Sequence, residues 1–288
     1  MTKGTRHEGV TVVALCKRTG MTRQAYYKKH TQQVRASIEE ERIIGWVQDI
    51  RSFHPKQGAR KLYFNLTSKF ETNDIKLGRD RFIEVLRRHD YLVERRRRYA
   101  RTTYSDPAFH RYLNQLKNLV LTAPNQAWVS DITYIATREG FLYLSLITDA
   151  YTREIVGYAV NNTLETTGCI KALQMALRSL TPGDHPIHHS DRGFQYSAHL
   201  YTDILKHHGL VISMTEKDHC AENALAERVN GILKTEYYLN YTFDTKELAR
   251  VACHQAVRLY NTDRPHLSLN YQTPSAFRKS AIAERVSA

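Results

Sequence analysis

The chain has 288 residues, of which 42% are hydrophobic and 25% charged, and we expect two or three compact units in a globular protein. It contains neither the roughly 18 uninterrupted apolar residues of a membrane helix nor the apolar segment of a signal peptide, so we expect a cytoplasmic protein without a membrane partner. Its 42 Lys and Arg exceed its 29 Asp and Glu, giving a net charge of +13. Nucleic acid is therefore the first partner to consider, with a basic surface that serves only solubility as the alternative.

Residues 1–33 are predicted to form a helix-turn-helix-like segment. In the stretch TVVALCKRTGMTRQAYYKK, Gly20 allows a tight turn between two helical runs. The second run carries Arg23 and Lys28, which we predict to contact DNA. A helical hairpin that makes no such contact is the alternative interpretation.

Residues 34–94 are predicted to form a helical DNA-binding domain. Ile43 and Val47 repeat at helical spacing, and a second apolar stripe follows around Phe82. A further helix begins near Gly58, where backbone amides together with Arg60 and Lys61 suit a phosphate group. A helical bundle with a solvated basic face is an equally simple interpretation of any one of these residues.

Residues 95–123 are predicted to be a basic linker or arm. The run of arginines resists burial because like charges repel each other, and beside nucleic acid it would follow the backbone or enter a groove. A solvated charge run is the alternative. The arginines predicted to contact DNA are Arg95, Arg96, Arg97 and Arg98.

Residues 124–278 have a different pattern, in which β-branched and aromatic runs alternate with segments of helical periodicity. The predicted order is β-β-β-α-β-α-β-α-α, an α/β unit whose first three strands are antiparallel, and residues 279–288 are expected to be a tail. Strands are predicted at 126–137, 140–152, 153–160, 186–191 and 211–215, and helices at 164–180, 197–209, 221–238 and 245–261.

Three acidic residues occupy informative places in this order. Asp131 lies in the first strand, Asp191 follows the fourth strand, and Glu227 lies in the helix after the fifth. Neighbouring strands and a helix can bring such residues together, and carboxylate oxygens are ligands that magnesium prefers. Asp149, at the end of the second strand, is the competing candidate, although we expect it to order the turn with Thr152.

Four motifs carry a resemblance: WVSDITY at 128–134, HSDRGFQY at 189–196, ENALAE at 222–227 continuing into LKTE, and YNTDRPH at 260–266. With 35 residues between Asp191 and Glu227, this region resembles the integrase core of bacterial insertion-sequence transposases. It is similar to the larger, catalytic-frame product of the insertion sequence 3 family and, more distantly, to retroviral integrases. Glu222 is a departure, since the family usually has Asp there.

The resemblance implies an RNase H-like integrase core, a five-stranded mixed sheet with flanking helices, preceded by helix-turn-helix-type DNA-binding segments. It implies that Asp131, Asp191 and Glu227 are catalytic and bind two Mg²⁺ or Mn²⁺ ions, for cleavage at the ends of the element and strand transfer. The partners implied are terminal inverted repeats, target DNA, further copies of the chain, at least as a dimer at the bacterial nucleoid, and an upstream-frame helix-turn-helix protein as fusion or partner.

Helical spacing adds to this interpretation, because four residues fall on one helix face, namely Asn223, Glu227, Asn230 and Lys234. An ordinary surface salt-bridge face is the alternative for that helix taken alone. For the whole chain the alternatives are a non-catalytic DNA-binding protein and an RNase H-like nuclease without strand transfer. The remaining predicted site residues are Lys234 and Arg264 for DNA contact, and His189, Asn223, Asn261 and His266 in supporting roles.

Overall fold

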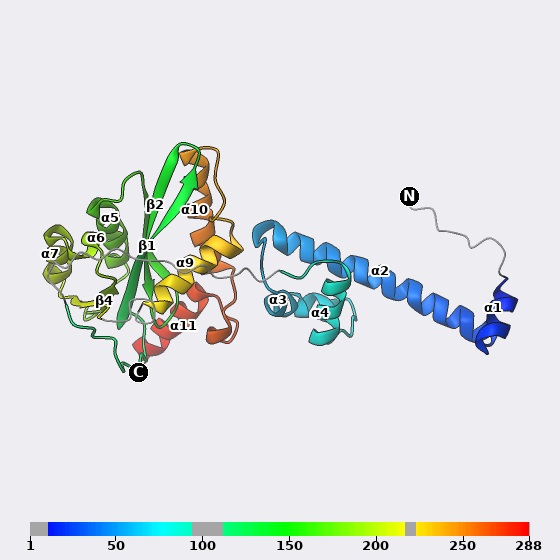
Figure 1. Cartoon of the computed structure of the whole chain (residues 1–288). Helices are drawn as coiled ribbons and strands as arrows, with labels where there is room; N and C mark the ends of the chain where they lie inside the picture. Colours follow the sequence, from blue (N-terminus) through cyan, green and yellow to red (C-terminus); the bar gives the residue numbers. More distant parts are fainter. Residues whose placement is uncertain (1–10, 94–111, 217–222, 288) are drawn as a thin grey trace. The chain divides into compact units, whose positions relative to one another are not determined.

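The computed structural model describes residues 11–93, 112–216 and 223–287 (Figure 1). The chain forms two compact units, one from the residues up to Ser52 with Gly58–Leu92, and one from Phe53–Gln57 with the residues from Val93 onward. None of the helices in the described ranges combines the length and apolar character needed to cross a membrane.

The first unit is helical and begins with the predicted turn between two helices. Helix α1 (Val12–Thr19) ends at Gly20, whose φ of 67° is the left-handed conformation that glycine adopts without steric cost. Helix α2 (Arg23–Phe53) then runs for 31 residues. It continues without a break through the boundary expected between residues 33 and 34, so the helix-turn-helix-like segment and the next helical segment share one helix.

Three helices supply the hydrophobic core of this unit. The second half of α2 contributes Ile43 and Val47, which pack against α3 (Ala59–Thr72) and α4 (Arg79–Arg88). Phe82, on the predicted second apolar stripe, is fully buried. The residues that α2 contributes to this core lie in its later part, as the apolar periodicity of the sequence indicates.

The second unit is built on a five-stranded mixed sheet with strand order β3-β2-β1-β4-β5. The first three strands form an antiparallel meander, and β4 and β5 run parallel to β1. The central strand β1 therefore pairs with both halves of the sheet. The strands are β1 (Ala127–Thr137), β2 (Gly140–Asp149), β3 (Ile155–Asn161), β4 (Ile187–Ser190) and β5 (Val211–Met214).

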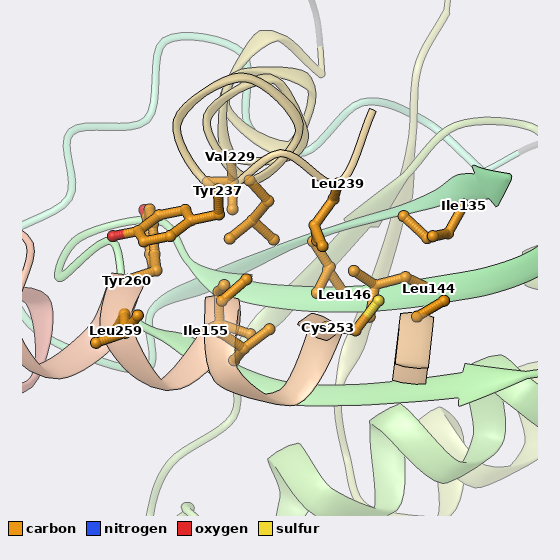
Figure 2. Packing of buried hydrophobic residues seen from close by; sticks show 14 of the residues in the cluster. Ile135, Leu144, Leu146, Ile155, Val229, Tyr237, Leu239, Cys253, Leu259 and Tyr260 are labelled. Carbon is orange, nitrogen blue, oxygen red and sulfur yellow. The ribbon is translucent and has the colours of Figure 1, made fainter. Parts of the chain in front are cut away.

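Helices cover both faces of this sheet. Side chains alternate along β2, so Leu144 and Leu146 join the core with α9 (Ala224–Glu236) and α10 (Lys246–Thr262), as Figure 2 shows. Ile147 joins the core on the opposite face. The helices of that face are α5 (Thr166–Leu177), the short α6 (Phe194–Ser197) and α7 (His199–His207).

The element order predicted from the sequence is confirmed, and the fold is the expected α/β integrase-core arrangement. The short α6, the 3₁₀ turn Leu267–Leu269 and helix α11 (Pro274–Ser287) were not predicted. Helix α11 continues past residue 278, where a tail was expected to begin. Its polar helix pattern gives little sign in the sequence that it packs on the core.

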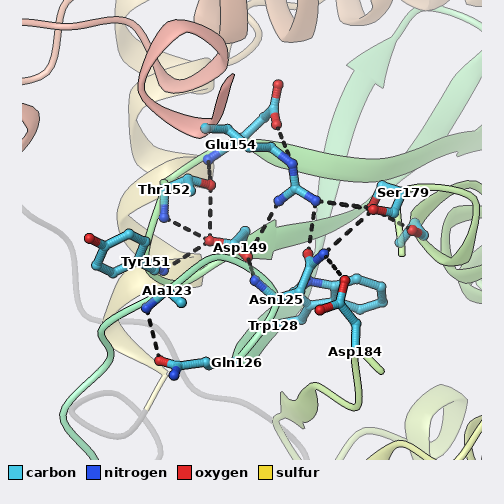
Figure 3. A network of polar contacts seen from close by, with 12 residues as sticks. Ala123, Asn125, Gln126, Trp128, Asp149, Tyr151, Thr152, Glu154, Ser179 and Asp184 are labelled. Carbon is cyan, nitrogen blue, oxygen red and sulfur yellow. Dashed lines mark hydrogen bonds and ion pairs between the residues drawn. The ribbon is translucent and has the colours of Figure 1, made fainter. Parts of the chain in front are cut away.

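Helix α11 is fastened to the sheet by a buried polar network (Figure 3). Arg278 lies among three partners: Nη2 donates to Asn125 Oδ1 at 2.8 Å, Nε lies 3.2 Å from Glu154 Oε2, and Nη1 lies 3.5 Å from Asp149 Oδ2. Further along α11, Arg285 binds Asp184 at 2.5 Å. Charged side chains thus hold α11 against the second unit, whereas most helices are held by an apolar face.

Close packing of α5 against β3 gives a first prediction. A Cβ atom at Gly157 would lie 2.2 Å from the carbonyl oxygen of Ala172, so Gly157→Ala must force the helix from the sheet. We expect the free energy of unfolding to fall by about 1–3 kcal/mol in chemical denaturation. The matched control is Gly231→Ala, because a Cβ there meets nothing within 4 Å and alanine favours the helix. Equal stability of the two variants would contradict the close approach.

The network at Arg278 gives a second prediction. Arg278→Met leaves the buried Asp149 carboxylate without its cation, and breaking such a pair costs about 3–5 kcal/mol. The neighbouring Lys279→Met variant changes an exposed residue of the same helix and serves as the control. Denaturant titration should therefore separate the two variants widely. If they unfold together, the ion pairs do not hold α11.

Candidate active site

The first candidate acid, Asp131, lies on the central strand β1, beside β2 and near β4. Its Oδ1 accepts a hydrogen bond from the backbone N–H of Ile132 at 2.9 Å. Its Oδ2 accepts one from the side-chain amide of Asn230, on α9, at 2.7 Å. The Asp131 carboxylate is therefore oriented by its own strand and by the helix packed against it.

The second acid, Asp191, directly follows β4, which runs parallel to β1. Asp191 Oδ1 accepts from the backbone N–H of Gly193 at 3.0 Å. A Cβ atom at position 193 would lie 2.9 Å from the same oxygen, so only glycine leaves room for this turn. The loop after β4 is thus shaped around the carboxylate.

The third acid, Glu227, is an exposed residue of α9 whose backbone N–H donates to Asn223 O at 3.1 Å. Asn223 itself is buried, and its side-chain amide donates to Ser130 O on β1 at 3.1 Å. Asn223 and Asn230 lie on either side of Glu227 along the helix. Both amides therefore tie the helix that carries Glu227 to the strand that carries Asp131.

Electrostatics links the three acids. The pKa of the Asp131 carboxyl is raised from 3.8 to about 7. Burial is the largest cause, and the charge of Asp191 adds to it, with a smaller contribution from Glu227. The hydrogen bonds from Asn230 and Ile132 act in the opposite direction. The structure thus brings the three predicted acids into electrostatic range of one another.

The donor chemistry fits a hard divalent cation, because carboxylate oxygens from three elements gather where their charges repel each other. The buried Oδ1 atoms of Asn223 and Asn230 have no hydrogen-bond partner among the described residues, which leaves further oxygen acceptors beside the acids. Within the described ranges, however, no three His, Cys, Asp or Glu side chains are gathered closely enough to hold one ion. An ion would have to draw the three acids closer together.

Asp149, the competing candidate, has a structural role. Its Oδ1 accepts from the backbone N–H of Thr152 at 2.7 Å and from the Thr152 hydroxyl at 2.9 Å. Its Oδ2 accepts from the backbone N–H of Asn125 at 2.7 Å and faces Arg278 (Figure 3). The carboxylate is fully buried and engaged on both oxygens, so the expectation that it orders the turn after β2 is confirmed.

Two buried histidines of β4 bond to side chains of neighbouring strands and helices. His189 is buried, with Nδ1 2.8 Å from the Ser213 hydroxyl on β5. His188 Nε2 lies 2.8 Å from both the Ser130 and the Tyr201 hydroxyls. Burial lowers the pKa of His188 to about 3, so this ring is neutral and its Nε2 lies between the two hydroxyls. His188 thus links β4 to β1 and α7, and His189 links β4 to β5.

The predicted cluster near residue 264 is internal. Arg264 is buried and binds Glu236 through two nitrogens, at 2.8 and 2.7 Å, while its Nη1 lies 2.8 Å from His266. The side chain of Asn261 bonds to both the N–H and the C=O of Ile155 on β3. Arg264 was predicted to contact DNA, but its guanidinium is committed to these partners inside the fold. Sequence alone did not reveal Glu236 as that partner.

The other residues predicted to contact DNA are scattered over both units. Arg23, Lys28 and Arg60 are exposed, whereas Lys61 and Lys234 are partly buried. The arginines from Arg95 to Arg98 lie outside the described residues. Helical spacing placed Asn230 on one face with Glu227, but the contact between Asn230 and Asp131 was not predicted.

The raised pKa of Asp131 predicts how stability depends on pH. Because the folded value lies above the unfolded one, ionisation of Asp131 destabilises the fold increasingly from pH 3.8 to about 7. In metal-free protein, Asp131→Asn should therefore raise the melting temperature by a few degrees above pH 7, corresponding to about 1 kcal/mol, and much less near pH 3.8. Asp203→Asn, which changes an exposed acid of α7, is the control. Parallel melting curves for the two variants at every pH would disprove the coupling.

Two protein-family models match parts of the second unit. A family model described as an integrase core domain matches residues 122–220, and a second model with that description matches residues 208–274. Among solved structures, the catalytic core domain of HTLV-2 integrase in complex with magnesium is 17% identical, with a TM-score of 0.43, and the match covers 54% of this chain and 97% of that one.

Two relatives extend the comparison over more of the chain. The putative transposase InsK for insertion sequence element IS150 of Escherichia coli (strain K12) is 36% identical over 166 residues, 57% of this chain and 58% of the relative. The insertion element IS600 uncharacterized 31 kDa protein of Shigella sonnei is 38% identical over 274 residues, 92% of this chain and 97% of the relative. The chain therefore belongs to the integrase-core family of insertion-element transposases.

Proposed function

We propose that the chain is a DNA transposase that cleaves DNA at the ends of an insertion element and joins those ends to a target. Asp131, Asp191 and Glu227 are the proposed catalytic and metal-binding carboxylates. The observation that supports this most directly is the hydrogen bond from the side-chain amide of Asn230 to Asp131 Oδ2 at 2.7 Å, because it holds the helix that carries Glu227 against the strand that carries Asp131.

Two Mg²⁺ or Mn²⁺ ions per site are proposed as cofactors, held by the three carboxylates together with DNA phosphate oxygens. When bound, such ions activate the attacking hydroxyl and stabilise the charge of the leaving oxygen. The residues of the chain hold the reacting groups in place. Asn230 and Ile132 fix both oxygens of Asp131, and Gly193 fixes one oxygen of Asp191.

The proposed reaction has two stages at this one site. Water first attacks a phosphodiester at the end of the element and leaves a 3′ hydroxyl, and that hydroxyl then attacks a phosphodiester of the target strand. Each attack breaks one phosphorus–oxygen bond as it forms another, so no covalent intermediate with the protein is needed. Lys234, seven residues beyond Glu227 on the same helix α9, is proposed to contact a DNA phosphate.

The proposed partners follow from this chemistry. The net charge of +13 favours DNA, and the exposed Arg23, Lys28 and Arg60 of the helical unit are proposed to contact terminal repeats at the nucleoid. Two ends must be held together for joining, so we propose an assembly of at least two copies. Fusion to, or association with, an upstream-frame helix-turn-helix protein is part of the same proposal.

The proposal predicts that Asp191→Asn and Glu227→Gln each lower the rate of joining by roughly 100-fold or more, because loss of one ligand removes several kcal/mol of transition-state stabilisation. Joining of terminal-repeat DNA to a plasmid should require Mg²⁺ or Mn²⁺ and stop when a chelator is added. Asp203→Asn changes an exposed acid of α7 that lies outside the sequence motifs, and it should join DNA at the normal rate.

Two rival functions give different results in that assay. Full joining by Asp191→Asn or Glu227→Gln would exclude the proposed roles of these acids. A non-catalytic DNA-binding protein would bind DNA without any metal-dependent nicking. An RNase H-like nuclease would cut DNA but leave a supplied pre-cleaved 3′ end unjoined, so a pre-cleaved substrate separates it from a transposase.

A further inference from the structure

Ser130, the residue directly before Asp131 on β1, is a junction between the elements that carry the three candidate acids. Its hydroxyl oxygen lies 2.8 Å from His188 Nε2 on β4, the strand that leads to Asp191. Its backbone carbonyl oxygen accepts a hydrogen bond from the side-chain amide of Asn223, at the start of α9, at 3.1 Å. Ser130 is fully buried, so water does not compete for either bond. One residue therefore joins all three elements.

The backbone pairing between β1 and β4 ends just before the acids. The last paired residues are Val129 and His189. Two more steps in this register would set Asp131 opposite Asp191. One step beyond the last pair, however, the backbone oxygen of Ser190 accepts a hydrogen bond from the N–H that directly follows β5, at 3.1 Å. The separation of the two acids therefore depends on side-chain bonds between the strands and not on the backbone ladder.

A second hydroxyl bonds to the same nitrogen of His188 and provides a comparison within the structure. The Tyr201 hydroxyl, on α7, also lies 2.8 Å from His188 Nε2, and the two rings pack edge to face with centroids 5.4 Å apart. Tyr201 is as fully buried as Ser130. Helix α7, however, carries none of the three candidate acids. The two bonds thus resemble each other in length and burial, and only the bond to Ser130 joins two acid-bearing strands.

We propose that Ser130 is a positioning residue for the candidate site, and that its hydroxyl limits, through His188, how far the end of β4 can move from β1. This inference rests on the proposed function, because it takes the acids of the two strands to bind metal. An ion has to draw these acids together. A bond that already restricts their separation lowers the ordering cost of that step, as groups that orient metal ligands do. Ser130 itself contacts neither the ion nor DNA.

The two hydroxyls allow a matched test, because Ser130→Ala and Tyr201→Phe each remove a single oxygen atom bonded to His188. Both variants should fold, with melting temperatures lowered by a similar few degrees, since each loses one buried hydrogen bond. Mn²⁺ alone is then titrated into the full chain without DNA, by calorimetry. Ser130→Ala should bind Mn²⁺ about ten-fold more weakly, and Tyr201→Phe should stay within about two-fold of the unchanged protein. Ions at the candidate site are identified by their loss in Asp191→Asn.

The joining assay separates weaker metal binding from other damage to the site. Ser130→Ala should need about ten-fold more Mg²⁺ for the half-maximal rate, and saturating Mg²⁺ should restore the rate to nearly that of the unchanged protein. Tyr201→Phe should keep the Mg²⁺ requirement of the unchanged protein. If Mg²⁺ does not restore the rate of Ser130→Ala, the hydroxyl acts by some route other than metal binding, and the inference is wrong.

The inference is also wrong if Ser130→Ala binds Mn²⁺ as tightly as the unchanged protein, or if Tyr201→Phe loses as much affinity, since both hydroxyls would then serve only the fold. The same holds if the unchanged protein binds no Mn²⁺ that Asp191→Asn loses. These results leave the proposed function intact if joining persists. Conversely, an unchanged protein that binds Mn²⁺ but joins no DNA defeats the proposed function, while the Mn²⁺ titrations still decide the role of Ser130.

Discussion

The bonds from α9 to β1 are the constraint on which the candidate site depends. Asp131 and Glu227 lie almost a hundred residues apart, and the amides of Asn223 and Asn230 fix the helix of one to the strand of the other. Each amide reaches a different acceptor, a backbone carbonyl and a carboxylate oxygen. The helix is therefore fixed against both rotation and sliding, which sets where Glu227 stands relative to Asp131.

This arrangement places a costly cluster of negative charge beside β1, the central strand of the sheet. The three acids repel one another, and the sheet around them contributes neutral groups such as His188 with its two hydroxyl partners. At the end of β2, Asp149 belongs to a network in which Arg278 lies between two carboxylates. The fold thus keeps the three acids of the candidate site apart from acids that ion pairs neutralise within the protein.

The periodicity and the order of the motifs were enough to predict the order of strands and helices. They also predicted that Asp131 lies in the first strand, that Asp191 follows the fourth, and that Asp149 has a structural role. The period of two along the strands and the buried apolar stripes carry that information locally. Contacts between side chains far apart in the sequence could not be predicted from this local information. The burial of Arg264 against Glu236 brings together two residues that lie 28 positions apart in the sequence. Helix α2 has no glycine or proline near residue 33 to mark the boundary expected there. The packing of α11 depends on ion pairs, and ion pairs produce no repeating pattern of apolar residues in the sequence.

The place of α11 in the chain has a consequence for how the protein is made. Arg278 comes from the last described helix, yet it completes the surroundings of Asp149 and Asn125, which are synthesised well over a hundred residues earlier. During translation, the buried carboxylate of Asp149 would lack the positive charge of Arg278 until helix α11 has left the ribosome. The helices of the first unit have their own core and can fold first. In a nascent chain, this helical unit would then be complete before the unit that carries the three acids.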